Sequence, residues 1–431
     1  MRIWDAGVET ASAAEVRALA GAAWTRQRDH LAASDFYRTK IGPDLQRADL
    51  GALAELPFTT KAELKSAQDA DPPFGPNLCV PPEAVKRIYQ TSGTTGTPSV
   101  LALTDRDQQT WTSIGARTYY ATGIDEGSSV LSTFGAGPFV AGHTQFAIMR
   151  VGARAVPVGP GDTERVLFGL RAGLADTLLA TPSFAQYLAN RLEPEPEPRL
   201  PGLTHVVTGG EPGGGIPAIR DHIQRVLDCT VTEVMGIGDL APSLFGECPE
   251  QQGMHFCGTG HVWPELVDPE TQAPVAIEPG ATGELAYTHL TREAMPVVRF
   301  LGGDMVRIEG VDCACGRTSF RMRCLGRRDD MIIVRGVNVY PTAVIAVVGE
   351  FRPHVTGRAR LVRPAGAVSV EPPVPVEVEV PAGAAPGNGL AEEIESAVRA
   401  RLTFRCRVRL VAEGSFGDAG YKTRLTRQAG S

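Results

Sequence analysis

The sequence predicts an α/β protein with a large N-terminal domain of βαβ sheets, a β-rich subdomain and a small α+β domain at the C-terminal end. From residue 87 onward, short apolar runs such as 128–134, 176–182 and 203–210 alternate with helical stretches and glycine-rich turns. This alternation is typical of stacked βαβ units with buried parallel strands. From residue 283 the β-rich runs follow one another directly, as antiparallel strands do. The last hundred residues then form a separate unit.

The local signals follow the same order along the chain. Residues 11–31 favour a helix, with Thr10 or Ser12 available as its cap. The runs 99–104 and 152–158 add two strands to the βαβ region, and the proline- and charge-rich stretch 193–202 predicts a surface connector. In the last part, VEVEV at 376–380 alternates as a one-sided strand does. A helical stripe follows at Leu390, Ile394, Val398 and Leu402.

Length and composition restrict the class of protein. A chain of 431 residues is too long for one ordinary core and indicates two or three domains. The formal net charge of −7 argues against a nucleic-acid or anionic-membrane partner, because either partner needs a basic face. The first residues contain no apolar run, and no window reaches the roughly 18 apolar residues of a membrane helix. We therefore expect a cytoplasmic protein.

The most informative stretch is IYQTSGTTGTPSV at residues 88–100. Its glycines let backbone N–H groups approach an anion, and its hydroxyl side chains add donors without bulk. The stretch lacks the GKS or GKT ending of a Walker loop, which argues against a kinase or GTPase. It indicates a phosphate-binding loop, with a Ser/Thr/Gly surface linker as the alternative. The residues expected to bind phosphate are Thr91, Ser92, Gly93, Thr94, Thr95, Gly96 and Thr97.

With Tyr89 and Gln90 in front, this loop resembles the phosphate-binding signature of the adenylate-forming superfamily, in its phenylacetate-CoA ligase-like branch. Further motifs of that branch follow in the expected order over most of the chain. The resemblance implies an ATP-dependent enzyme that activates a carboxylic acid. Residues 1–328 would form the adenylation core that binds nucleotide and acid, and residues 329–431 would form a small mobile lid. Asp329 would be the hinge on which this lid turns.

The resemblance also assigns residues to the nucleoside. The strand and turn at 204–212 would lie beside the adenine, bordered by Gly209, Gly210 and Glu211. Asp304 would accept hydrogen bonds from the two ribose hydroxyls, and Arg327 would help to hold the ribose. Ahead of Asp304, the family's Arg-Thr is replaced by residues 301–303, Leu-Gly-Gly, so the contacts of those side chains are lost.

The segment EVMGIGDLA at 233–241 resembles a second nucleotide-binding motif. Met235 and Gly236 stand where the family has Tyr-Gly, and Asp239 stands in the place of the usual acid, one methylene shorter. A carboxylate at this position would be a hard oxygen ligand for the Mg²⁺ of MgATP. The alternative for Asp239 is an acid in a surface turn.

Adenylation joins a carboxylate to the α-phosphate, and because both are anions, catalysis requires charge neutralisation and alignment. In the family, a mobile lysine of the small domain supplies part of this charge. Lys422 is the only lysine beyond Lys86, and its surroundings resemble the family's Gly-Lys-x-x-Arg ending with an extra tyrosine. We assign Lys422 as the catalytic lysine, with a solvated basic tail as the alternative.

Eight cysteines are too sparse for a disulfide framework in a chain of this length, so buried free thiols are the simplest interpretation of most of them. Three thiols and one imidazole nevertheless suit a closed tetrahedral zinc site. Those residues are Cys248, His255, Cys313 and Cys315. Some phenylacetate-CoA ligase relatives with similar Glu-Cys…His and Cys-x-Cys motifs hold zinc, so the resemblance implies a structural clip. Cys257 and His261 are competing ligands.

Residues 132–146 resemble the glycine-rich helix start that floors the family's acid pocket. Phe134, Ala136, Phe139, His143 and Gly236 would line this pocket. Small residues beside two phenylalanines suit a flat aromatic acid better than a long aliphatic chain. Ala136 stands where phenylacetate-type relatives usually carry a tyrosine, which argues against phenylacetate itself.

Together, these motifs predict an enzyme that uses ATP and Mg²⁺ to convert a small aromatic carboxylic acid into acyl-AMP and pyrophosphate. A thiol would then take the acyl group, and in the phenylacetate branch this thiol is usually that of coenzyme A. Residues 342–431 show no CoA signature, so a carrier-protein arm, an amine or a hydroxyl acceptor stays open, as does a homodimer. The rival classes are an adenylate-binding homologue without turnover and a zinc-clipped scaffold that binds no nucleotide.

Overall fold

The computed structural model describes residues 3–91, 99–135, 137, 139–196, 200, 202–335, 337–364, 369–383, 387, 389–417 and 425–428. It confirms the α/β class, with a large mixed set of strands and a small α+β sheet near the C-terminal end. The chain divides into two compact units, one of residues 1–179 and 232–323, the other of residues 180–231 and 324–431. The expected boundary after residue 328 and the mobility of residues 329–431 stay predictions.

The first unit holds most of the helices and strands of the described chain. Its helices and 3₁₀ turns are α1 (Ala6–Glu9), α2 (Ala13–Leu31), α3 (Asp35–Ile41), α4 (Asp44–Arg47), η1 (Ala52–Glu55), α5 (Lys61–Ala70), η2 (Pro82–Ala84), α6 (Asp105–Thr122), η3 (Val140–His143), α7 (Thr144–Val151) and α8 (Thr163–Arg171). Its strands are β1 (Arg87–Gln90), β2 (Val100–Leu103), β3 (Ser129–Ser132), β4 (Arg154–Pro157), β5 (Thr177–Ala180), β7 (Thr230–Ile237), β8 (Ala241–Glu247), β9 (Met254–Phe256), β10 (Val262–Val267), β11 (Pro274–Val275), β12 (Thr282–His289), β13 (Phe300–Gly310) and β14 (Arg321–Arg327).

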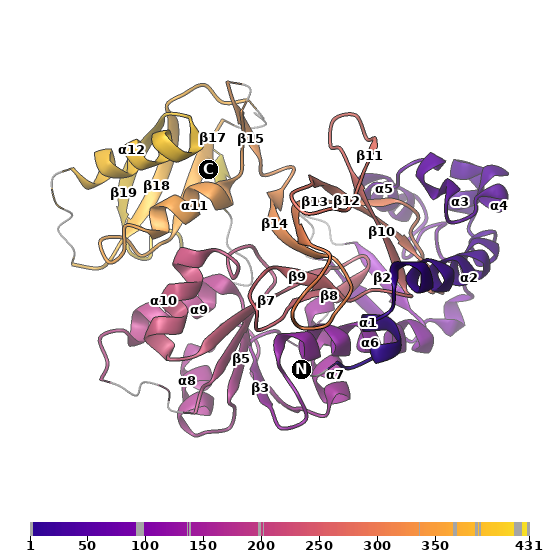
Figure 1. The fold of residues 1–431 in the computed structure, drawn as a ribbon, viewed down its shortest axis with the longest axis horizontal. Coiled ribbons are helices and arrows are strands. Elements are labelled where there is room, and N and C mark those ends of the chain that lie inside the picture. The colour runs from indigo at the N-terminus through magenta and orange to yellow at the C-terminus, as the bar shows by residue number, and fades with distance from the viewer. Residues whose placement is uncertain are drawn as a thin grey trace. The chain divides into compact units, whose positions relative to one another are not determined.

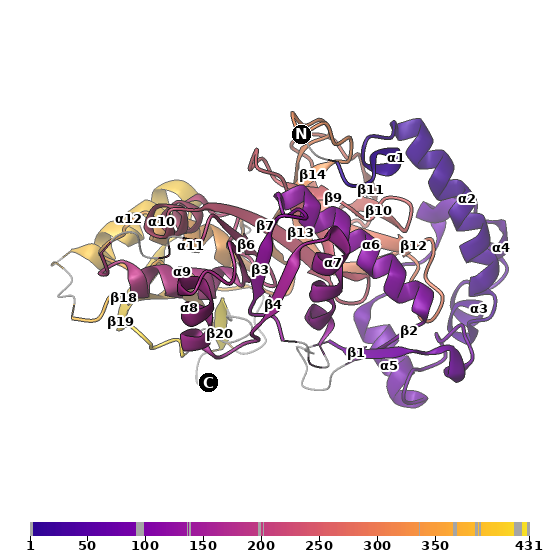
Figure 2. The same cartoon turned by 90° about the horizontal axis from the view of Figure 1, so that it is seen from below.

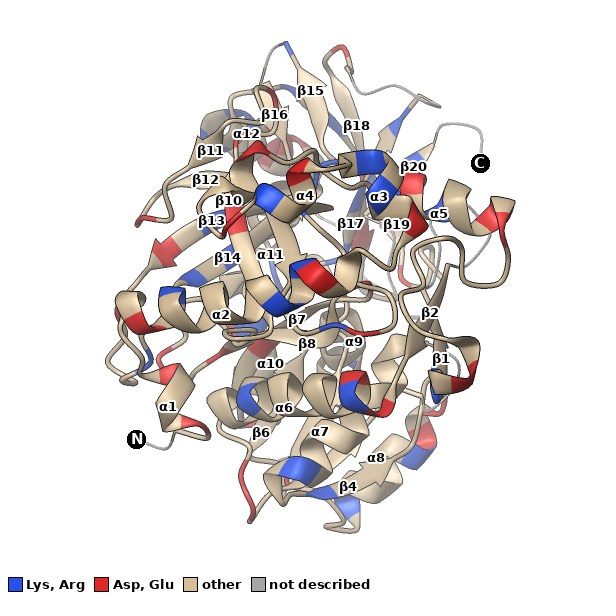
Figure 3. Ribbon diagram, turned by 90° about the vertical axis from the view of Figure 1, so that its right-hand side faces the viewer, with Lys and Arg blue, Asp and Glu red and all other residues tan. Residues whose placement is uncertain are grey.

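These strands form a hairpin of β1 and β2, a parallel set in the order β5-β3-β4, and a mainly antiparallel set in the order β11-β10-β12-β13-β14-β9-β8-β7. Helix α6 packs on β8 with α7 beside it (Figure 2). Its Trp111 is part of the core that this antiparallel set buries. The N-terminal helices have a second core around Trp24, whose indole N–H donates to the carbonyl of Ala48 at 2.9 Å. Acidic and basic residues are intermixed along α2, α3 and α4 (Figure 3).

The second unit is built around a small sheet. Its helices are α9 (Pro182–Leu192), α10 (Pro217–Leu227), α11 (Pro341–Gly349) and α12 (Leu390–Leu402), and its strands are β6 (His205–Thr208), β15 (Ile332–Val334), β16 (Val337–Val339), β17 (Ala359–Arg363), β18 (Val374–Val380), β19 (Cys406–Ala412) and β20 (Thr426–Gln428). Strands β15 and β16 form a hairpin, and the sheet runs in the order β19-β18-β17-β20. Helix α11 contacts β17 and helix α12 contacts β19, so both helices pack on this sheet (Figure 1).

Most expected elements occur at the expected residues. The helix expected over 11–31 is α2, and Ser12 and Glu15 form a capping box at its start. The run 99–104 was wrongly expected to be a parallel strand, because β2 pairs antiparallel with β1. The connection over 91–99 is too short for the crossover of a dozen or more residues that a parallel pair needs. Within the described residues, no helix has the length and apolarity needed to span a membrane.

Candidate active site

The stem of the phosphate loop is the part that the structure describes. At the end of β1, the N–H of Thr91 donates to the carbonyl of Ser99 at 3.0 Å and closes the loop. The Thr91 hydroxyl is buried, and no described residue bonds to it, which suits a donor kept for a ligand. The remaining loop residues lie outside the described residues, so their phosphate contacts stay predictions: Ser92, Gly93, Thr94, Thr95, Gly96 and Thr97.

The segment that follows β7 packs against this stem. A Cβ at Gly238 would lie 3.3 Å from the methyl carbon of Thr91, so the two backbones are close neighbours. Gly236 occupies a position that only glycine fits, because an added Cβ would lie 1.9 Å from the carbonyl oxygen of Pro242. Met235 is partly buried and packs against the core of the first unit. The structure therefore brings two of the sequence-predicted nucleotide motifs together.

Asp239 is buried and forms an ion pair with Lys61, a residue that none of the sequence motifs indicated. Its side chain is 8% exposed, and its Oδ2 lies 3.2 Å from Nζ of Lys61. Lys61 begins α5, which a capping box between Thr60 and Glu63 fixes in place. Both residues line one cavity with Ser99 at the end of the phosphate loop. The capping pattern Thr60-x-x-Glu63 predicts the helix start, but the contact with Asp239 is set by tertiary packing.

A second cation lies near the same carboxylate. The guanidinium of Arg292 is buried 4.8 Å over the ring of Trp111 and 4.0 Å from Asp107. Burial lowers the pKa of Arg292, while the carboxylates of Asp107 and Asp239 act to raise it. Arg292 therefore interacts with two carboxylates, Asp107 and Asp239, and links the start of α6 to the surroundings of the cavity.

Asp304, the predicted ribose ligand, lies on β13 and is 9% exposed. A Cβ at Gly302 would lie 3.5 Å from the carboxylate of Asp304 and 3.5 Å from the ring of Tyr287. The N–H of Gly303 donates to the carboxylate of Glu284 at 3.0 Å. The glycine at 302 therefore lets the backbone pass in close contact with the ring of Tyr287 beside Asp304, where a larger side chain would meet both.

The predicted acid pocket contains a histidine enclosed by aromatic rings. His143 makes edge contacts with Trp111 and Tyr89, with centroid distances of 5.4 Å and 6.2 Å. Its Nε2 lies 3.4 Å from the hydroxyl of Thr112, and its Nδ1 has no partner among the described residues. Burial lowers the pKa of His143 to about 4, so the ring is neutral at pH 7.

The other pocket residues differ in exposure. Phe134 is buried and follows β3, whereas Phe139 is 38% exposed. Phe139 forms a bridge with Gln90 and so lies beside the strand that leads into the phosphate loop. Ala136 lies outside the described residues. The structure places Phe139 next to the loop stem, and the lining role of the full set stays a prediction.

In the second unit, the predicted adenine-binding turn follows β6. The N–H of Gly209 donates to the carbonyl of Ala180 at 3.0 Å, and Gly210 has a φ of 88°, which favours glycine. The carboxylate of Glu211 accepts a hydrogen bond from the N–H of Ser183 at 2.9 Å, in the first turn of α9. Glu211 therefore satisfies an otherwise unpaired helix N–H, and its place beside the adenine stays a prediction.

The predicted hinge of the second unit is exposed. Nε of Arg327 lies 3.0 Å from Oδ1 of Asp329, with the two side chains 40% and 59% exposed. The carbonyl of Asp329 accepts a hydrogen bond from Nη1 of Arg363 at 3.1 Å. Lys422 lies outside the described residues, so its catalytic role stays a prediction.

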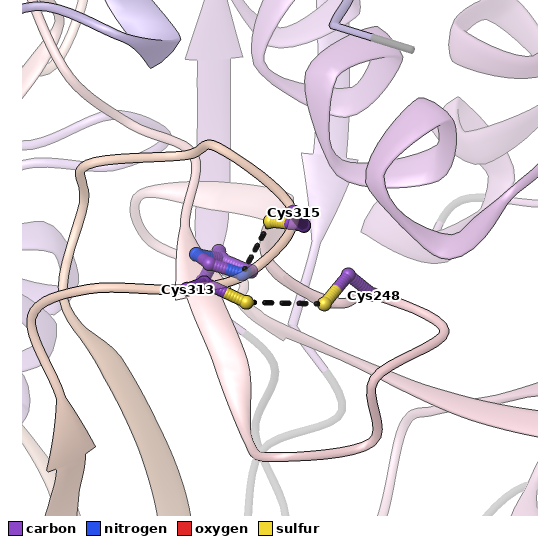
Figure 4. Close-up of side chains that lie close together, drawn as sticks. Cys248, Cys313 and Cys315 are labelled. Atoms are coloured by element: carbon purple, nitrogen blue, oxygen red, sulfur yellow. Dashed lines mark hydrogen bonds between the residues drawn. The ribbon is translucent and has the colours of Figure 1, made fainter. Parts of the chain in front are cut away.

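The predicted zinc ligands gather at one place in the first unit (Figure 4). One donor atom from each residue lies within 4.8 Å of all the others, in the set Cys248, His255, Cys313 and Cys315. Sγ of Cys248 lies 3.7 Å from Sγ of Cys313, and Sγ of Cys315 lies 3.3 Å from Nε2 of His255. A tetrahedral Zn²⁺ with Zn–S bonds of about 2.3 Å separates its sulfur ligands by about 3.8 Å. The donor set therefore fits a closed zinc site.

The surroundings of this cluster favour a thiolate at Cys315, whereas the hydrogen bond with Cys315 raises the pKa of Cys248 and burial raises the pKa of Cys313. Nη1 of Arg317 lies 3.7 Å from Sγ of Cys315, and its Nε donates to the carboxylate of Glu9 at 2.7 Å. Hydrogen bonding from Cys248, followed by the contact with His255, lowers the pKa of Cys315. The two competing ligands are not part of the described cluster, since Cys257 bonds a backbone carbonyl and His261 contacts the hydroxyl of Thr291.

Comparison with known proteins identifies the family. Residues 16–289 match the family described as "AMP-binding enzyme". The chain belongs to this family of adenylate-forming ligases. It is 37% identical to the phenylacetate-coenzyme A ligase of Thermus thermophilus over 310 residues, which are 70% of this chain and 67% of that protein. It is 33% identical to the phenylacetate-coenzyme A ligase of Escherichia coli over 362 residues, which are 80% of each chain.

Solved structures of a third ligase extend the likeness to nearly the whole chain. The 2-hydroxyisobutyryl-CoA ligase in its postadenylation state with R3-HIB-AMP has a TM-score of 0.88 and 26% identity, covering 99% of this chain and 92% of that one. The same ligase in an open conformation with 2-HIB-AMP and CoA has a TM-score of 0.70 and 27% identity, covering 97% and 93%. This chain therefore shares the fold of a ligase that has been seen in more than one conformation.

Proposed function

We propose that this adenylate-forming ligase activates a small aromatic carboxylic acid with MgATP and transfers it to coenzyme A. In the first half-reaction, a carboxylate oxygen bonds to the α-phosphorus, the bond from that phosphorus to pyrophosphate breaks, and acyl-AMP forms. In the second half-reaction, the CoA thiol loses its proton, its sulfur bonds to the acyl carbon, and the C–O bond to AMP breaks. The products are acyl-CoA, AMP and pyrophosphate.

Family membership supports the first half-reaction. The acceptor is proposed from the relatives, because two are phenylacetate-coenzyme A ligases and the solved 2-hydroxyisobutyryl-CoA ligase holds CoA. A carrier-protein arm, an amine or a hydroxyl group is the alternative acceptor. We also propose that the enzyme acts in the cytoplasm.

The observation that carries the proposal is the ion pair between the buried Asp239 and the partly exposed Lys61, beside the stem of the phosphate loop. Asp239 would hold Mg²⁺, whose charge would offset that of the phosphates. The Lys61 side chain is 44% exposed, so its ammonium can turn from Asp239 toward a phosphate oxygen. Mg²⁺ and the Lys61 ammonium would then both neutralise charge at the place where the acid and the phosphates, two anions, must meet.

The resemblance supplies the other roles. Lys422 would neutralise the α-phosphate during adenylation, and Asp304 would hold the ribose. In the second unit, Gly209, Gly210 and Glu211 would border the adenine, Arg327 would contact the ribose, and Asp329 would be the hinge.

An aromatic substrate is proposed from the lining residues of the first unit. Phe139 lies beside the strand that leads into the phosphate loop, and Phe134 and His143 are buried close to it in sequence. Aromatic rings pack favourably on flat apolar ligands. The neutral His143, with an unpartnered Nδ1 among the described residues, suits a hydroxyl or amino substituent on the ring.

Acid-dependent exchange of labelled pyrophosphate into ATP, with a panel of benzoates and hydroxybenzoates, tests the proposal. We expect exchange with at least one acid, and its loss in Lys422→Ala. The active acid is then incubated with ATP and CoA, and an acyl-CoA product is sought by mass spectrometry. Exchange without acyl-CoA would replace CoA by another acceptor. If no acid supports exchange and saturating ATP does not raise the unfolding temperature, the rival hypothesis of a zinc-clipped scaffold that binds no nucleotide is favoured instead.

A further inference from the structure

The sheet of the second unit has an apolar face and a charged face. Along β18, the four valines at 374, 376, 378 and 380 are buried and alternate with Glu377 and Glu379. The strand register places Arg360 of β17 and Arg409 of β19 directly across from Glu377, one on each side. Glu377 therefore lies between two guanidinium groups on the charged face.

A third arginine completes the surroundings of Glu377. Nε of Arg360 lies 2.5 Å from Oε2, Nη2 of Arg427 lies 2.9 Å from Oε1, and Arg409 also bonds Oε1. The Glu377 side chain is 2% exposed. Burial alone would raise the pKa of Glu377, but the hydrogen bonds from the three arginines lower it to about 2. One carboxylate that is ionised at neutral pH thus bonds arginines of three different strands, β17, β19 and β20.

Strand β20 depends on such polar contacts more than its neighbours do. It has three residues, lies at the edge of the sheet and pairs with β17 alone. None of its residues is buried, so apolar burial contributes little to holding it. Arg427 bonds Glu377, and the hydroxyl of Thr426 lies 3.4 Å from the carboxylate of Asp330. Among the described residues of β20, Arg427 makes the charged contact.

The position of β20 limits where the proposed catalytic lysine, Lys422, can lie. Lys422 is four residues ahead of Thr426 in the sequence. An extended chain spans at most about 3.6 Å per residue, so a fixed β20 keeps the Lys422 backbone within about 14 Å of Thr426. Asp330, which Thr426 contacts, is next to Asp329, whose carbonyl accepts from Arg363. The strand after the lysine is therefore attached to the hinge segment as well as to the sheet.

We infer that Glu377 is a positioning residue for adenylation: by binding Arg427 it fixes the strand that limits where Lys422 can reach. The inference rests on the proposed role of Lys422. It predicts an effect on the half-reaction in which the lysine neutralises the α-phosphate, and none on thioester formation from a supplied acyl-AMP.

The test compares two arginines that share the Glu377 carboxylate. Arg427→Gln removes the contact to β20, and Arg409→Gln is the matched control, because it also takes one guanidinium from Glu377 but lies on β19. For both variants, acid-dependent pyrophosphate exchange is measured with the benzoate or hydroxybenzoate that is active in the wild type. Formation of acyl-CoA from the corresponding acyl-AMP and CoA is measured separately. Limited trypsin digestion with mass spectrometry follows cleavage after Lys422 and Arg424.

We expect Arg427→Gln to lower the kcat of exchange about 10- to 100-fold, since a small misplacement of a catalytic group has effects of this size. Thioester formation should be unchanged, cleavage after Lys422 or Arg424 should be faster, and Arg427→Lys should recover much of the exchange. Arg409→Gln should resemble the wild type in all three assays. Equal effects of the two Gln variants, or an equal loss of both half-reactions in Arg427→Gln, would overturn the inference.

The digestion assay separates this inference from the proposed function. If no acid supports exchange in the wild type, the proposed function fails, and digestion alone decides whether Glu377 anchors the tail. Cleavage at the wild-type rate in Arg427→Gln would then reject the anchoring too.

Discussion

Removal of one cysteine ligand should release the zinc and destabilise the first unit strongly. Cys248 and Cys313 are 65 residues apart in the sequence, so a metal bound by both closes a long loop. The chain-entropy relation for a cross-link of this length gives about 4 kcal/mol of stabilisation. For the roughly 270 residues of the first unit, the average unfolding entropy per residue gives about 1.8 °C per kcal/mol, which corresponds to a drop of about 7 °C in the unfolding temperature.

The assay pairs metal analysis with calorimetry. Wild-type protein purified without added metal should hold about one equivalent of zinc, and a strong chelator should lower its unfolding temperature. Cys313→Ser should hold none, unfold at the lower temperature and no longer respond to the chelator. Cys229→Ser changes a half-buried thiol outside the cluster and should keep both the zinc and the chelator response. Wild-type protein with less than about half an equivalent, or with no response to the chelator, would refute a closed zinc site.

Three further predictions follow from single contacts. Gly236→Ala should lower the free energy of unfolding by about 3 kcal/mol or more in a denaturant titration, because the new Cβ meets the backbone of Pro242. The control is Gly21→Ala in the open surroundings of α2, which should leave the free energy of unfolding unchanged or raise it. Lys61→Met should lower pyrophosphate exchange about 10- to 100-fold, while Lys65→Met, which loses only a surface pair with Asp69, should not. The arginines overcome the effect of burial and lower the pKa of Glu377 from 4.5 to about 2. The ionised Glu377 therefore contributes about 3 kcal/mol to the free energy of unfolding above pH 4.5, and this contribution is lost as the pH falls toward 2. In acid titrations, Glu377→Gln should remove this part of the pH dependence; an unchanged titration would contradict it.

The parts of the fold that could be predicted are those with local signals. The capping residues of α2 and the apolar runs of β3, β4 and β5 are specified within a few residues of where they act. The alternation of β18 predicted the strand, but a one-sided strand would expose its glutamates, and Glu377 and Glu379 are buried among arginines. Their partners come from other strands, so the sequence of β18 alone holds no information about them.

The candidate site shows the same division between local and distant information. The phosphate loop, Asp239 and the four metal ligands stand out through short motifs. The partner of Asp239 is 178 residues away in the sequence, and Glu9 and Arg317 beside the metal cluster are 308 residues apart. No motif links such pairs, because packing of separate elements, and not local spacing, brings them together.

The surroundings of Asp239 also bear on the rival hypothesis of an adenylate-binding homologue without turnover. The ion pair between the buried Asp239 and the partly exposed Lys61 contributes little to stability, because desolvation of the carboxylate and solvent screening at the ammonium offset their attraction. Asp239 is 8% exposed, and the Thr91 hydroxyl near it is buried without a partner among the described residues, so this region holds polar groups that folding does not require. A protein that only bound adenylate could use the same polar groups, because the bound phosphate is an anion in both cases. The arrangement therefore favours a site for phosphate, and the kinetic test separates the two hypotheses: loss of pyrophosphate exchange in Lys61→Met with ATP binding intact would favour the enzyme, whereas a wild-type protein that binds ATP without exchange would favour the adenylate-binding homologue.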